Sequence, residues 1–100
     1  MSVSDADIAF ALELFAPLGG LSQRKMFGGL SIYHNGDIFC IVSSDARIYL
    51  KCGKDLAADL KASGSEQFHN MPYWSLPDED LDDPDAASAQ ARRALLSLKV

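Results

Sequence analysis

The stretch SQRKMFGGLSIYHNGDIF, residues 22–39, decides the fold of this chain. Asn35-Gly36 lies between two apolar runs and predicts a two-residue type I′ turn, because both central positions of that turn need positive φ. The glycine pair Gly28-Gly29 enters a strand, and the cations Arg24 and Lys25 come before it. Dinucleotide-binding loops instead carry glycines that open a helix. We therefore favour a bulge or a bend between strands over an anion-binding loop.

The hairpin turn also predicts the pairing of an antiparallel β-meander within residues 22–51. Ile32 should face Phe39, and Tyr33 should face Ile38. A second turn within residues 43–46 should then bring Phe39 opposite Leu50. In this register one face is wholly apolar and is predicted to be the core face. It consists of Leu30, Ile32, Phe39, Ile41, Ile48 and Leu50.

The opposite face of the predicted meander is half apolar, which is unusual for a face in contact with water. The segment MPYWSLP, residues 71–77, could add aromatic binding anchors at its edge; a core plug at one end of the sheet is the other interpretation. We interpret this face as a protein-contact surface, with a homodimer as the simplest case. Coverage by the chain's own C-terminal helix is the alternative. The expected surface consists of Tyr33, Ile38, Cys40, Val42, Tyr49, Tyr73 and Trp74.

Cations accompany this predicted surface, and two of them lie on one strand. We expect them at the rim, where they would orient a partner more than they would add affinity. Binding of a small anion is the alternative role. These residues are Arg24, Lys25, Arg47 and Lys51.

Helical periodicity predicts three helices around the meander. The first covers residues 4–16 and begins with a capping box of Ser4 and Asp7. The second covers residues 54–62, and the third begins at Asp83-Pro84, an N-cap followed by a first-turn proline. The predicted fold class is α+β: a two-layer sandwich of an antiparallel β-meander with N-terminal, middle and C-terminal helices, in a single domain at 1–100.

No motif in the sequence predicts catalysis, a metal or a cofactor. The acidic run at 78–85 has the alternating carboxylates of a calcium loop, but it lacks that loop's central glycine and its final glutamate. His34 and His69 have no partner at ligand or triad spacing. Cys40 and Cys52 are expected on opposite faces of a strand pair, which disfavours a disulfide between them. We therefore expect a protein that is not an enzyme.

Composition restricts the function further. The 100 residues carry a net charge of −5 with a pI near 4.7, which disfavours direct nucleic-acid binding through bulk electrostatics. The sequence has no apolar run of the ~20 residues that a membrane span needs. It also begins without the basic segment of a signal peptide. We expect a cytoplasmic protein without membrane contact.

Several segments in order resemble one family: APLGG (16–20), RKMFGGLSIY (24–33), IYLK (48–51), GSEQF (64–68), MPYWSLP (71–77) and ARRALL (91–96). Together they resemble the N-terminal domain of the TfoX/Sxy proteins, bacterial regulators of natural competence with a link to transcription. The resemblance implies an antiparallel sheet against helices, with no known catalytic residues and no cofactor. Full-length competence regulators carry a second domain, so we expect a free-standing single-domain relative or a trimmed piece.

These observations favour a non-enzymatic regulatory or protein-interaction domain. A module that binds a small molecule or an anion is the second hypothesis. Direct nucleic-acid binding is a weaker one, because of the net charge.

Overall fold

The computed structural model describes residues 3–26 and 28–98. Within these residues the chain forms three α-helices, two short 3-10 helices and a five-stranded antiparallel sheet with the strand order β1-β2-β3-β4-β5. The predicted α+β architecture is therefore confirmed. The elements are α1 (Asp5–Leu14), η1 (Ala16–Leu18), β1 (Leu21–Met26), β2 (Gly29–His34), β3 (Asp37–Val42), β4 (Ile48–Lys51), α2 (Lys54–Ala62), β5 (Tyr73–Ser75), η2 (Asp78–Asp80) and α3 (Pro84–Ser97).

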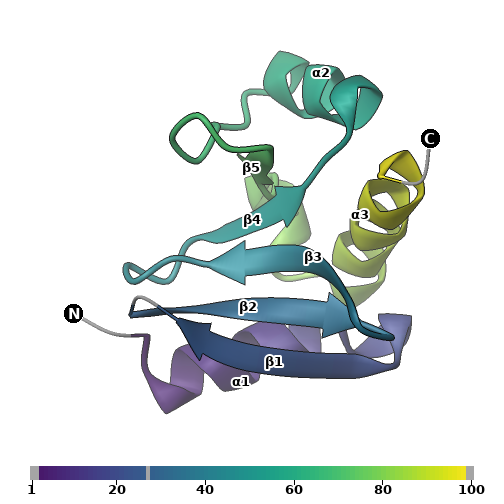
Figure 1. The fold of residues 1–100 in the computed structure, drawn as a ribbon. Coiled ribbons are helices and arrows are strands. Elements are labelled where there is room, and N and C mark those ends of the chain that lie inside the picture. Colours follow the sequence, from purple (N-terminus) through teal and green to yellow (C-terminus); the bar gives the residue numbers. More distant parts are fainter. Residues whose placement is uncertain (1–2, 27, 99–100) are drawn as a thin grey trace.

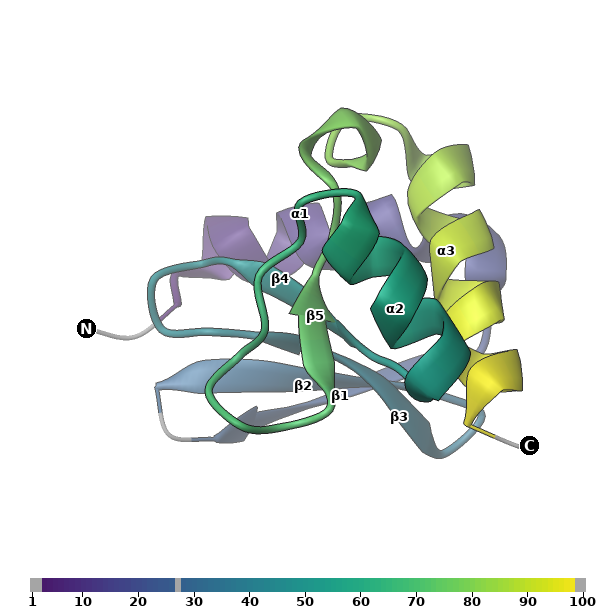
Figure 2. The same cartoon turned by 90° about the horizontal axis from the view of Figure 1, so that it is seen from above.

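The helices cover one side of the sheet. Figures 1 and 2 show α1 and α3 behind the strands, with α2 beside β4 and β5. The core lies between these layers and includes Phe15 after α1, Leu50 on β4 and Leu60 on α2. None of the helices in the described residues is both long and apolar enough to cross a lipid bilayer.

The hairpin between β2 and β3 has the predicted turn but an unpredicted bulge. Asn35 and Gly36 have φ values of 51° and 87°, as a type I′ turn requires. Tyr33 pairs with Ile38 as predicted, but Ile32 pairs with Cys40, so Phe39 has no opposite residue. This one-residue insertion shifts the rest of the strand relative to its neighbours.

The bulge corrects the predicted core face. Cys40, not Phe39, lies opposite Leu50, so the predicted Phe39–Leu50 pair is wrong. Phe39 is nevertheless fully buried, and its ring packs edge-on against Phe15 with the centroids 5.2 Å apart. Ile41 pairs with Ser31 and therefore lies on the face opposite the predicted one.

The glycine pair makes the bend between β1 and β2. Gly28 has a φ of 77°, which favours glycine, and Met26 pairs with Gly29 across the bend. A Cβ atom on Gly29 would collide with the backbone oxygen of Val42 on β3. The prediction of a bend between strands is confirmed; Phe27 lies outside the described residues.

The predicted helix starts are also confirmed. Ser4 and Asp7 form the reciprocal hydrogen bonds of a capping box at α1. The Asp83 side chain accepts hydrogen bonds from the backbone N–H groups of Asp85 and Ala86 at α3. The buried side of α3 additionally contains Ser88, whose hydroxyl donates to the Leu14 backbone oxygen at 3.2 Å.

The two cysteines are free and buried. The prediction that they lie on opposite faces is wrong, because Cys40 is opposite Leu50, and Cys52 follows Leu50 by two residues. Burial raises the pKa of both thiols, that of Cys52 to about 12. Neither thiol is therefore a ready nucleophile at neutral pH.

Candidate interaction surface on the open face of the sheet

The side of the sheet away from α1 and α3, here called the front face, faces the viewer in Figure 1. Side chains alternate along each strand, and directly paired residues share a face. Among the side chains that the strand pairings assign to the front face are Met26, Ser31, Tyr33, Ile38, Ile41, Tyr49 and Tyr73.

A hollow of about 740 Å³ opens on this face, here called the front hollow. The turn Ser43–Asp45 borders it on one side. Met26 and Met71 contribute side chains that are 43% and 45% exposed. Aromatic and aliphatic groups form most of its wall: Met26, Leu30, Ile41, Val42, Tyr49, Phe68, Met71 and Tyr73.

One wall of the front hollow is a segment that follows α2, residues 65–71, here called the strap. The Ser75 N–H donates to the Glu66 backbone oxygen at 2.9 Å, and the Phe68 N–H donates to the Tyr73 backbone oxygen at 2.8 Å. The strap therefore extends the sheet beyond β5. The Phe68 ring packs on Tyr49 with the centroids 4.9 Å apart, which leaves Tyr49 only 7% exposed.

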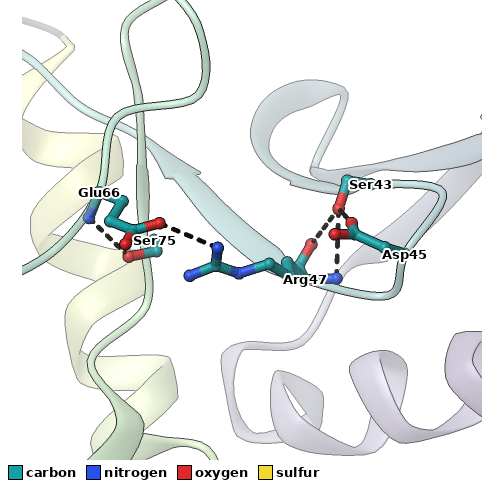
Figure 3. A network of polar contacts seen from close by, with 5 residues as sticks. All are labelled: Ser43, Asp45, Arg47, Glu66 and Ser75. Carbon is teal, nitrogen blue, oxygen red and sulfur yellow. Dashed lines mark hydrogen bonds and ion pairs between the residues drawn. The ribbon is translucent and has the colours of Figure 1, made fainter.

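Polar contacts hold the strap and the neighbouring turn in place (Figure 3). Arg47 and Glu66 form an ion pair at 2.9 Å, and the Ser75 hydroxyl accepts from the Glu66 N–H at 2.9 Å. The Ser43 hydroxyl accepts from the Arg47 N–H at 3.2 Å and also bonds the Asp45 carboxylate. That bond lowers the pKa of Asp45.

Beside the hollow, one polar side chain is completely buried in the sheet. The Ser31 hydroxyl lies 3.3 Å from the Tyr33 hydroxyl and 3.3 Å from the Arg24 backbone oxygen. Burial is also the main cause of a raised pKa at Tyr73. The Ser31 hydroxyl is thus bonded to its neighbours, and the wall of the hollow is mainly apolar. Such a surface can receive an apolar or aromatic side chain.

The structure separates the predicted surface residues into two groups. The first group lies on the front face and consists of Tyr33, its pairing partner Ile38, Tyr49 and Tyr73. The strap covers Tyr49 through the Phe68 ring. Cys40, Val42 and Trp74 do not lie there. The bulge turns Cys40 and Val42 into the core, although Val42 still contributes to the wall of the front hollow. Trp74, opposite Leu50, packs against the core.

Sequence reasoning did not assign several large apolar residues of the hollow to this surface, among them Met26, Ile41, Phe68 and Met71. Ile41 was hidden by the bulge. Phe68 and Met71 reach the face through long-range strap contacts, which leave no periodic signal. Met26 alone had a local signal in the sequence. A tight bend that ends at Gly29 would pair Met26 with Gly29.

The predicted cations are not gathered into one site. Arg24 and Lys25 are neighbours on β1, so their side chains lie on opposite faces. Arg47 pairs with Glu66 and also lies over the Tyr49 ring at 5.8 Å. Lys51 lines a separate hollow with Leu95 and Leu98. Within residues 3–26 and 28–98, no group of three His, Cys, Asp or Glu side chains could hold a metal ion.

The comparison with family models gives a match to the TfoX N-terminal domain over residues 13–97. The chain belongs to the TfoX N-terminal domain family. The match runs from the end of α1 to the end of α3, so the sheet, the strap and the front hollow of this TfoX N-terminal domain all lie inside it. A comparison with curated proteins finds no significant match.

Proposed function

We propose that this TfoX N-terminal domain is a non-enzymatic regulatory module that binds a protein through its front face. Membership of the TfoX N-terminal domain family supports a role like that of a competence regulator. The observation that carries the binding role is the front hollow, with two methionines that remain nearly half exposed. The partner is another protein or a second copy of the chain.

The chemistry of the hollow suits a protein partner. Methionine side chains are flexible and polarisable, and they adapt to the shape of a partner's side chains. Aromatic residues supply much of the binding energy in protein interfaces. Here Met26 and Met71 line the hollow together with Tyr49, Phe68 and Tyr73, while Ser43, Asp45 and Gln67 add polar groups to its wall. An apolar centre with a polar border is the usual anatomy of an interface.

A small apolar molecule is the second candidate ligand. The hollow's volume of about 740 Å³ lies within the roughly 300–1,000 Å³ of small-molecule sites. The anion-binding form of this hypothesis is weaker, because Arg24 and Lys25 diverge and Arg47 is paired with Glu66.

A charge in the hollow tests the proposal. Met71→Glu places a carboxylate among apolar groups without disturbing a buried side chain, since Met71 is 45% exposed. Leu96→Glu, at a residue of α3 that is 66% exposed, is the matched control. Tagged versions of the unaltered domain and both variants would be compared by quantitative affinity capture, with sedimentation to detect self-association.

We expect a partner or a dimer that is retained by Leu96→Glu and weakened at least tenfold by Met71→Glu, with unchanged circular dichroism. Equal binding by all three proteins would contradict the proposal. A monomer that captures no protein, but melts at a higher temperature with small apolar compounds, would support the second candidate instead.

A further inference from the structure

We infer that β1 binds an extended acidic segment of another protein, which adds to the sheet as a further strand. This interaction uses the edge of the sheet, and the proposed function uses the front hollow. The inference rests on four features of the structure: the exposure of β1, the direction of its backbone groups, the local charge and the poor fit of a second copy.

β1 is the outer strand on its side of the sheet, and its residues 22–26 are exposed. The other edge is occupied, because the strap pairs with β5 through the Glu66 and Phe68 backbones. Natural proteins usually cover or shorten an exposed edge, since it can pair with another strand. A six-residue strand is long enough for such pairing.

The backbone N–H and C=O groups of alternate residues in β1 point outward, away from β2. The Asn35 N–H donates to the Gly20 backbone oxygen at 2.9 Å, so the polar groups of residue 20 point toward β2. Backbone groups alternate sides along an antiparallel strand. The N–H and C=O groups of Leu21, Gln23 and Lys25 therefore point away from β2. Among the described residues, β2 is the only strand that pairs with β1, and no backbone hydrogen bond from outside the strand ladders reaches these groups.

The sequence segment that contains β1 and β2 has a net charge opposite in sign to that of the whole chain. No acidic residue occurs between Glu13 and Asp37, a segment that includes Arg24 and Lys25. Residues 14–36 therefore carry +2, and because the net charge is −5, the rest of the chain carries −7. Arg24 and Lys25 point to opposite faces of the edge. A carboxylate on one face of an added strand would meet Arg24, and a carboxylate on the other face would meet Lys25. Cross-strand pairs of opposite charge stabilise a sheet.

A second copy of β1 fits this edge poorly. In a two-fold antiparallel pair, opposed residues share a face, so one residue lies opposite its own counterpart. The registers that pair five of the six residues of β1 are centred on residue 23 or residue 24. The registers centred on Arg24 or Lys25 oppose like charges directly, which is destabilising. Centring on Gln23 places the two Arg24 side chains on a diagonal of the same face. Charge therefore favours an acidic partner over a copy of this chain.

The probe is a blocked peptide of alternating valine and glutamate, about seven residues long, with an alternating valine–lysine peptide as its control. We expect the glutamate peptide to slow hydrogen exchange at the Leu21, Gln23 and Lys25 amides at least tenfold, without protecting α3. The lysine peptide should leave these rates unchanged. Absence of protection by the glutamate peptide at millimolar concentration, or equal protection by both peptides, would overturn the inference.

Proline substitutions test the backbone geometry. Gln23→Pro removes an outward N–H and should abolish peptide binding while the fold is kept, because edge strands tolerate proline at such positions. Arg24→Pro removes an N–H that points toward β2 and should destabilise the sheet. If a folded Gln23→Pro variant still binds the glutamate peptide, the inference is overturned. It is also overturned if the unaltered domain forms a concentration-dependent dimer that Gln23→Pro loses, because a second copy would then occupy the edge.

The edge and the hollow can be tested separately. Met71→Glu should leave binding of the glutamate peptide unchanged, since Met71 belongs to the strap side of the sheet. Gln23→Pro should leave capture of a front-face partner unchanged. Loss of both interactions in both variants would overturn the assignment of a separate site to β1.

Discussion

At the scale of single residues, Phe39 shows how one side chain sets the pairing of a strand. It is the extra residue of the bulge, yet it is fully buried beside Phe15. A bulge allows two successive residues to turn toward the same side of a sheet. Phe39 and Cys40 thus both face the helices, and Ile41 is left for the front face.

Replacement of Phe39 by alanine should destabilise the fold by about 3–5 kcal/mol, because it leaves a cavity where the ring packs on Phe15. Chemical denaturation monitored by circular dichroism gives the change in unfolding free energy. Phe10→Ala is the matched control, since Phe10 is 47% exposed and should change stability by less than about 1 kcal/mol. Similar losses for both variants would contradict the burial of Phe39.

The buried thiols give a prediction about alkaline pH. A thiol ordinarily ionises near pH 9.0, but burial raises the pKa of Cys52 to about 12 and also raises that of Cys40. Between these values the unfolded chain has lost protons that the folded chain keeps, so stability falls as pH rises from about 9 toward 12. The fall is at most about 1.4 kcal/mol per pH unit for each thiol.

The double variant Cys40→Ala/Cys52→Ala isolates this effect, because tyrosines and lysines titrate in both proteins. Unfolding free energies measured from pH 8 to pH 11 should fall more steeply for the unaltered protein than for the variant. If the unfolding free energies of both proteins fall equally with pH, burial does not keep these thiols protonated at alkaline pH.

At the scale of elements, local signals predicted boundaries well and register poorly. Asn35-Gly36 and Asp83-Pro84 act through their own backbone and side chains, so the turn and the helix start can be read from a few letters. The bulge lies in DIFCIV, where five apolar residues follow one another. Alternation between apolar and polar residues is absent there, so no period could reveal which residue is extra.

The N-cap of α3 can be tested by removing one side chain. Asp83→Ala should cost about 1 kcal/mol, because the backbone N–H groups of Asp85 and Ala86 lose their acceptor. Asp82→Ala removes the same charge one residue earlier without removing that acceptor. Equal unfolding free energies for the two variants would mean that charge near the helix start, not capping, explains the effect.

At the scale of the whole molecule, the sheet has one face packed on helices and one face that the chain covers only in part. Hydrophobic periodicity predicted the two-layer arrangement and the existence of a second, partly apolar face. It did not predict the strap, because the contact of Phe68 with Tyr49 joins residues 19 positions apart. The front hollow is a product of this long-range contact, so its residues became known only in three dimensions.

The most direct test of the front face uses the ε-methyl groups of Met26 and Met71 as probes. The domain would be labelled with ¹³C-methyl methionine and ¹⁵N, and titrated with a partner found by affinity capture. We predict that both methyl signals and the Ile41 amide shift together, while amides on the exposed side of α1 do not. Shifts confined to the helices, with both methyl signals unchanged, would contradict binding through the front face.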